Sequence, residues 1–125
     1  MSASPWATDN MPRVTTNGVV FMAKKFRDAN PKVTSAVYAA FDEVSAFINK
    51  EPRQSAEIYI RMTNEKRSNA DEMAKMIFDP DNVWATTPLN AMRYVEFMNK
   101  VGTVKKVPAD WRDMFMPEVH GLKGS

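Results

Sequence analysis

A long amphipathic pattern that begins at Asn30-Pro31 constrains the fold of this chain more than any other feature. Asparagine is a favoured helix N-cap, and proline suits the first helical position because its missing N–H is not needed there. Apolar residues then recur at helical spacing along one stripe: Val33, Val37, Ala40, Phe41, Val44, Phe47 and Ile48. The pattern predicts a helix over residues 31–50.

Three more segments combine a helix start with apolar residues at helical spacing. Pro52 follows a break and begins the first of them. Asn69 and Glu72 have the spacing of a capping box, in which each side chain accepts a hydrogen bond from the backbone N–H of the other residue. Pro88 begins the last, and Gly102 stands where a left-handed residue is expected to end a helix. The predicted helices cover residues 52–63, 69–78 and 88–101.

The segment before these helices is the only part whose composition favours β-structure. Residues 14–22 are uncharged and rich in β-branched side chains. Asn17-Gly18 also suits a tight turn, which would divide the segment into two strands. A single strand leaves its backbone groups unpaired, so it needs a partner. We therefore predict a mainly α fold with four helices and one or two short N-terminal strands.

The length of 125 residues is close to the commonest size of one domain. Residues 1–12 are polar and interrupted by prolines, and we expect an irregular arm there. We expect residues 13–125 to form a single mainly helical domain. No apolar run approaches the roughly 18 residues that are needed to span a membrane.

The composition argues against several functions. Seventeen basic residues are interleaved with 15 acidic ones, and the formal charge of +2 is too small to favour nucleic-acid binding. The chain has no cysteine, which excludes disulfides, thiolate metal sites and a cysteine nucleophile. Its one histidine, His120, lies near the C-terminal end. We therefore predict no catalytic residue, no metal site and no cofactor, in a protein that is not an enzyme.

The order of short motifs along the chain is more informative than any one of them. TTNGVV at 15–20 is followed by FRDANPKV at 26–33 and by FINKEP at 47–52, which separates two predicted helices. The last third runs from an aromatic helix through VGTVKK at 101–106 to PADWRDMF at 108–115. Such an order is hard to obtain by chance.

This order resembles that of the periplasmic substrate-binding proteins of nitrate/sulfonate/taurine-type ABC transporters, over most of the chain from about residue 15 to residue 125. The family is related to thiamine-pyrimidine-precursor-binding proteins. The resemblance implies a type II periplasmic-binding fold, in which two α/β lobes close on a small anionic or zwitterionic solute and the closed form docks on a membrane permease. Because 125 residues are too few for two lobes, the chain resembles only the C-terminal part.

The resemblance places Thr15, Thr16 and Asn17 near the hinge between the lobes. Hydroxyl and amide groups there can hydrogen-bond a nitrate, sulfonate or carboxylate, which makes these residues the candidate ligand-binding site. The same groups can instead satisfy local backbone at the end of a strand, and the sequence leaves this open. Thr86 and Thr87 have a similar ambiguity, because a predicted helix N-terminus attracts anions but also needs capping.

We therefore expect the solute-binding component of an ABC importer, present as a C-terminal fragment that binds no solute by itself. One alternative is a stand-alone helical interaction or oligomerisation domain derived from that fold. The other is a fragment similar to a pyrimidine-precursor synthase, an enzyme that needs histidine and cysteine chemistry.

Location and assembly follow from the same reasoning. The resemblance implies a periplasmic protein, whereas the absence of a visible export signal implies a cytoplasmic one if the chain is the full natural product. A piece of a two-lobed protein exposes the surface that its missing lobe covers. We expect that surface to include the edge of residues 19–22 and one face of the helix around residues 94–97, and we expect a homodimer.

Overall fold

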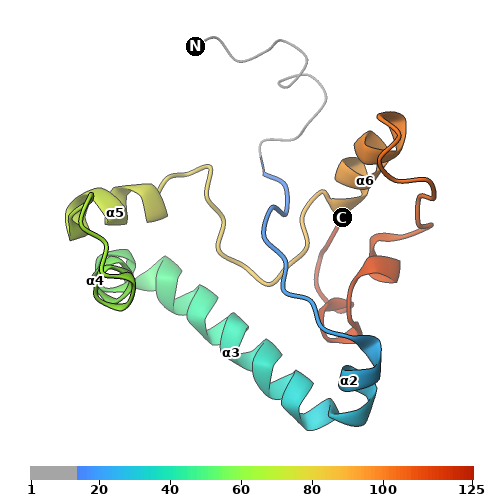
Figure 1. The fold of residues 1–125 in the computed structure, drawn as a ribbon, viewed down its shortest axis with the longest axis horizontal. Helices are drawn as coiled ribbons and strands as arrows, with labels where there is room; N and C mark the ends of the chain where they lie inside the picture. Colours follow the sequence, from blue (N-terminus) through green and yellow to red (C-terminus); the bar gives the residue numbers. More distant parts are fainter. Residues whose placement is uncertain (1–13) are drawn as a thin grey trace. The chain divides into compact units, whose positions relative to one another are not determined.

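The computed structural model describes residues 14–125, and the arm expected at residues 1–12 lies outside this range. The described part is mainly helical, with 56% of its residues in helices and no strand. Its five α-helices and two 3-10 helices are, in chain order, α2 (Lys24–Ala29), α3 (Pro31–Lys50), α4 (Pro52–Thr63), α5 (Ala70–Ile77), α6 (Ala91–Lys100), η1 (Trp111–Met114) and η2 (Pro117–Val119) (Figure 1).

The described residues divide into two compact units. The first unit contains residues 14–31 and 87–125, and the second contains residues 32–86. The first unit therefore joins two segments that are far apart in the sequence, whereas the second is continuous.

In the second unit, α4 packs against α5 (Figure 1). Ser55 and Ala56 of α4 are buried, and the Ser55 hydroxyl donates to the carbonyl of Glu51 at 2.8 Å. Arg53 joins the two helices because its Nε donates to the Asp71 carboxylate at 3.0 Å. This ion pair is exposed, so it adds little to the stability of the helix pair.

The segment after α5 returns along α3 in the opposite direction. The Asn49 side-chain amide donates to the Trp84 carbonyl at 2.7 Å, and two residues later the Thr86 hydroxyl donates to the Asp42 carboxylate at 2.9 Å. These two bonds lie on one side of α3. Three residues of its apolar stripe stay exposed: Val33, Phe41 and Val44.

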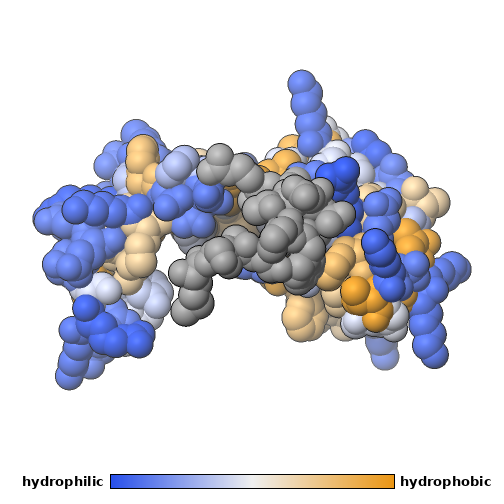
Figure 2. All heavy atoms as spheres, turned by 90° about the horizontal axis from the view of Figure 1, so that it is seen from above, coloured by the Kyte–Doolittle hydropathy of each residue, from blue (hydrophilic) through white to orange (hydrophobic). Residues whose placement is uncertain are grey.

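In the first unit, a stretch of extended chain leads into α2, and a mostly irregular stretch follows α6. We call residues 17–21 the extended segment and residues 109–125 the closing segment. Trp111 of the closing segment is 5% exposed and is the largest buried apolar residue of the described chain. Figure 2 shows hydrophobic residues at the surface among hydrophilic ones.

Two of the predicted helices have the observed bounds, since α3 covers residues 31–50 and α4 covers residues 52–63. The capping box of α5 is confirmed: the Asn69 side chain accepts from the backbone of Glu72, and the Glu72 carboxylate accepts from the backbone of Asn69. Gly102 is also confirmed as a left-handed residue, with φ of 83° directly after the cap of α6.

The predicted start of the last helix at residue 88 is wrong, because α6 begins at Ala91. Asn90 has φ of 52° and ψ of 30°, a left-handed conformation through which an α-helix cannot continue. The six-residue α2 was not predicted, since so short a helix carries little periodic signal.

The predicted N-terminal strands are also wrong for the described residues. Residues 14–23 form no helix and no strand. A strand is defined by the ladder it makes with a neighbour, and β-propensity alone supplies no neighbour.

Candidate functional site

Thr16, the central residue of the predicted ligand site, is paired with Leu89. The Thr16 backbone N–H donates to the Leu89 carbonyl at 2.8 Å, and the Leu89 N–H donates to the Thr16 hydroxyl oxygen at 2.7 Å. The pairing joins residues 73 positions apart in the sequence. It fixes the start of the extended segment to the loop that precedes α6.

Two further contacts hold the same loop. The Asn90 side-chain amide donates to the Val14 carbonyl at 2.7 Å. Ser125 makes three hydrogen bonds to this loop. Its hydroxyl oxygen accepts from the Asn90 N–H at 2.9 Å, and its backbone oxygen accepts from the Ala91 N–H at 2.6 Å. Its own N–H donates to the Pro88 carbonyl at 3.1 Å. We call Val14, Thr16, residues 88–91 and Ser125 the junction cluster.

The junction cluster arranges three successive backbone N–H groups toward oxygen atoms. The N–H groups of Leu89, Asn90 and Ala91 donate to Thr16 or to Ser125. Amides at the start of a helix attract anions, because they lack partners within the helix and lie at the positive end of its dipole. Here oxygen atoms of the protein itself occupy that position, so the cluster stabilises the unit.

The three predicted site residues differ in their surroundings. Thr16 directs its hydroxyl oxygen to Leu89, whereas Asn17 is exposed and makes no hydrogen bond to the described residues. Thr15 is half-buried. The geometry thus favours, for Thr16, the interpretation in which the side chain satisfies backbone.

Thr86 and Thr87 do not lie at the start of a helix. The Thr86 hydroxyl is bonded to Asp42, and α6 begins four residues after Thr87. The feature that made these residues candidates for anion binding is therefore absent at their positions.

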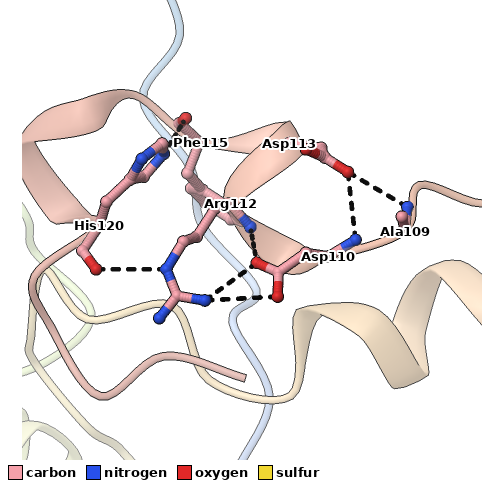
Figure 3. A network of polar contacts seen from close by, with 6 residues as sticks. All are labelled: Ala109, Asp110, Arg112, Asp113, Phe115 and His120. Atoms are coloured by element: carbon pink, nitrogen blue, oxygen red, sulfur yellow. Dashed lines mark hydrogen bonds and ion pairs between the residues drawn. The ribbon is translucent and has the colours of Figure 1, made fainter.

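The closing segment contains a second polar cluster, shown in Figure 3. It begins with a capping box on η1: the Asp110 carboxylate accepts from the Arg112 N–H at 2.9 Å, and the Asp113 carboxylate accepts from the Asp110 N–H at 3.1 Å. Asp113 also accepts from the Ala109 N–H at 3.2 Å. The two carboxylates thus satisfy the amides at the start of η1.

Arg112 connects this capping box to the end of the chain. Its guanidinium contacts the Asp110 carboxylate at 3.1 and 3.3 Å, and its Nε donates to the His120 carbonyl at 3.3 Å. The His120 Nε2 donates to the Phe115 carbonyl at 2.8 Å. The Arg112 N–H lowers the pKa of Asp110 most, burial opposes this shift, and the guanidinium adds to it.

Trp111 is surrounded by the residues of this network. The Arg112 guanidinium lies 4.6 Å from the centroid of its ring, and the rings of Phe115 and His120 each lie 6.1 Å away. Gly124 is so close that a Cβ atom there would lie 2.7 Å from the Trp111 ring. Trp111 is thus packed among residues of its own segment, whereas Trp84 is 40% exposed.

Two kinds of feature are absent from the described part of the chain. They contain no group of three His, Asp or Glu residues that could hold a metal ion. No helix among them has both the length and the apolar character that a bilayer crossing requires.

Comparison with known proteins gives no assignment. No protein-family model matches the sequence, and no curated protein or solved structure is significantly similar to it.

Sequence reasoning did not find the contacts of the junction cluster. No sequence motif marks Leu89, Asn90 or Ser125. In the sequence they lie 73 or more positions after Val14 and Thr16. The only local signal was the uncharged segment around Thr16 itself, which indicated a need for a partner but not its identity.

Proposed function

We propose that this chain is the C-terminal part of the solute-binding protein of an ABC importer, and that it is not an enzyme. The observation that carries the proposal is the extended segment. Its apolar residues Val19, Val20 and Phe21 are exposed, and it leads into the helix α2. An uncharged run of this kind is typical of a strand inside an α/β sheet, and residues 14–125 contain no strand that could pair with it.

Several features support assigning the missing sheet to a lobe of a binding protein. The sequence order from residue 15 onward resembles that of nitrate/sulfonate/taurine-type binding proteins. The proposed type II periplasmic-binding fold has its strands in two lobes. A mainly helical C-terminal part is compatible with that arrangement.

The proposal has consequences for ligand and location. The solute is a small anion or zwitterion, such as nitrate, a sulfonate or taurine, and the complete protein works in the periplasm beside a membrane permease. A cleft needs two walls. Thr15, Thr16 and Asn17 therefore contribute to binding only when the missing lobe is present.

The test begins with the DNA around the coding region. We expect an open reading frame for an α/β lobe next to these 125 codons, and genes for a permease and an ATPase nearby. A protein that contains both parts is expected to bind taurine, nitrate or an alkanesulfonate with a dissociation constant below about 10 μM, which is roughly −7 kcal/mol. The 125-residue chain, used as the control, is expected to show no heat of binding.

Two results would contradict the proposal. One is the absence of both the lobe and the transporter genes. The other is tight binding of a solute by the 125-residue chain alone.

A helical interaction domain is the second candidate, and the exposed apolar residues favour it. They include Val19, Val20 and Phe21 in the first unit, and Met62 and Phe78 in the second. Such residues on a soluble domain mark surfaces that contact a partner. A missing lobe combined with missing transporter genes would favour this candidate.

Fewer observations support the enzyme alternative than the other two candidates. Its histidine chemistry would depend on His120, whose Nε2 is bonded to the Phe115 carbonyl and whose ring lies against Trp111.

A further inference from the structure

Asn17 is followed directly by Gly18, and the sequence contains no other Asn-Gly pair. An asparagine side chain can react with the backbone nitrogen of the next residue when the chain between them is free to rotate. Glycine permits this rotation best, since it has no Cβ and the widest range of backbone angles. The pair at 17 and 18 is therefore the place in the sequence where such a reaction is easiest.

The structure leaves both reacting groups free. Asn17 and Gly18 are exposed, and neither makes a hydrogen bond to another described residue. Apart from the chain neighbours of Gly18, no atom lies within 4 Å of the position that a Cβ there would occupy. Rotation that brings the Gly18 nitrogen to the Asn17 side chain thus breaks no hydrogen bond within the described part of the chain.

The other seven described asparagines are held by the structure. Five of them donate a side-chain hydrogen bond to a backbone carbonyl, at 2.6–2.9 Å: Asn30, Asn49, Asn82, Asn90 and Asn99. The Asn69 side chain accepts from two backbone amides. Asn64 is followed by Glu65, whose N–H donates to the Ile60 carbonyl at 3.2 Å. Each of the seven therefore has to break a hydrogen bond before it can react with the residue that follows.

We propose that Asn17 is a site of spontaneous deamidation, at which the chain gains a carboxylate one position after Thr16. The Gly18 nitrogen attacks the side-chain carbonyl carbon of Asn17 and loses its proton to water. The new C–N bond closes a succinimide ring, and the bond from the same carbon to the amide nitrogen breaks, so that ammonia leaves. Water then opens the ring at either of its carbonyls, which gives aspartate or isoaspartate at position 17.

Either product changes the surroundings of the predicted binding residues. Residues 14–23 contain no charged side chain, so the new carboxylate is the only charge among them. Isoaspartate also adds a methylene to the main chain, which shifts the register of the residues that follow. In the proposed binding protein, a negative charge at this place opposes an anionic solute. The deamidation itself does not depend on the proposed function, because it rests only on the freedom of Asn17 and Gly18.

Incubation of the purified chain at neutral pH and body temperature, followed by digestion with trypsin and mass spectrometry, tests the proposal. Trypsin cleaves after Arg13 and Lys24, and Asn17 is the only asparagine between them. Each conversion of an amide to a carboxyl raises the mass of a peptide by about 1 Da. We expect residue 17 to convert at least about tenfold faster than any of the other seven, where a hydrogen bond must open first. A sample digested before incubation gives the zero point.

Gly18→Ala is the matched variant. The position of its Cβ is open, and the φ of Gly18 lies outside the left-handed range, so alanine fits without strain. Alanine narrows the range of backbone angles and hinders the attack, so we expect conversion at residue 17 to slow at least about tenfold. Circular dichroism of the variant is expected to match that of the natural chain.

Ala91→Gly separates the effect of the structure from that of the Asn-Gly pair. It creates a second such pair that begins at Asn90, whose side-chain amide donates to Val14, while the backbone N–H of residue 91 donates to Ser125. In the folded variant we expect Asn17 to convert at least about tenfold faster than Asn90. In urea that unfolds the chain, we expect the two sites to convert at similar rates, because both are then free.

Three outcomes would overturn the proposal. The first is retention of the amide at residue 17 in the folded chain while the urea-unfolded chain loses it. The second is equal conversion at Asn17 and Asn90 in a folded Ala91→Gly variant, which would mean that hydrogen bonding does not select the site. The third is equal conversion of residue 17 in the natural chain and in Gly18→Ala.

Discussion

The closing segment and the extended segment belong to the same unit, but they satisfy their polar groups in opposite ways. In the closing segment, Asp110, Arg112 and Asp113 bond the backbone amides and carbonyls of near neighbours around a buried Trp111. Residues 17–21 make no hydrogen bond to any other residue of the described part of the chain, and Thr16, which precedes them, is bonded to Leu89. A short irregular stretch can complete itself when it contains its own donors and acceptors. A stretch of β-branched residues needs another strand.

Among the changes that test this contrast, removal of the Trp111 ring is expected to lower the free energy of unfolding most. Trp111→Ala empties the centre of the closing segment and is expected to lower the free energy of unfolding by about 3–5 kcal/mol. Urea unfolding followed by circular dichroism measures the change. Trp84→Ala is the control: because Trp84 is 40% exposed, we expect a loss of about 1 kcal/mol. Equal losses would show that the closing segment is not organised around Trp111.

Addition of one methyl group at Gly124 is expected to have the next largest effect. A Cβ atom there would lie within 2.7–2.9 Å of three atoms of the Trp111 ring. We expect Gly124→Ala to cost about 1–3 kcal/mol of stability through overpacking. The position of Gly121 is open, so Gly121→Ala is expected to stay within about 0.5 kcal/mol of the natural chain. Urea midpoints that are the same for the two variants would contradict the close approach of Gly124.

Thr16, which anchors the start of the extended segment, is expected to contribute less to the free energy of unfolding than Trp111 or Gly124. Thr16→Val keeps the shape of the side chain but leaves the Leu89 N–H without its acceptor, at a cost of about 1–2 kcal/mol. Asn17→Ala, one residue further along, is expected to change stability by less than about 0.5 kcal/mol. Proton exchange at Leu89, measured by NMR, is expected to accelerate only in Thr16→Val. If Asn17→Ala has the same effect, Thr16 is not the anchor.

The smallest expected effect is a dependence of stability on pH through Asp110. Its pKa in the folded chain lies below the usual value of 3.8, chiefly because its carboxylate accepts the Arg112 N–H. The stabilisation is therefore fully present above that value and is lost as the pH falls through the folded pKa. Asp110→Asn keeps a capping acceptor but does not titrate. We expect the urea midpoints of the two chains to differ at pH 5 and to converge toward pH 2. A constant difference would contradict this role of Asp110.

The sequence predicted most accurately what depends on neighbouring residues. The bounds of α3 and α4, the capping box of Asn69 with Glu72, and the left-handed Gly102 all follow from groups a few positions apart. Such groups meet whenever the helix forms, so no distant segment is needed to bring them together.

The failed predictions concern groups that meet only through the tertiary structure. The helix predicted from residue 88 begins at Ala91, because Leu89 is bonded to Thr16 and Asn90 is left-handed. The strands predicted over residues 14–22 do not form, because a strand requires a second chain segment in register.

The sequence by itself thus determined α3, α4, the capping box of α5 and the left-handed Gly102, through periodic apolar residues and short-range hydrogen bonds. Only the tertiary structure decided that Thr16 pairs with Leu89, that Ser125 occupies the amides at the start of α6, and that Val19 to Phe21 stay exposed. The physical reason is distance along the chain. A contact across 73 residues depends on how the whole unit closes, and no local pattern encodes it.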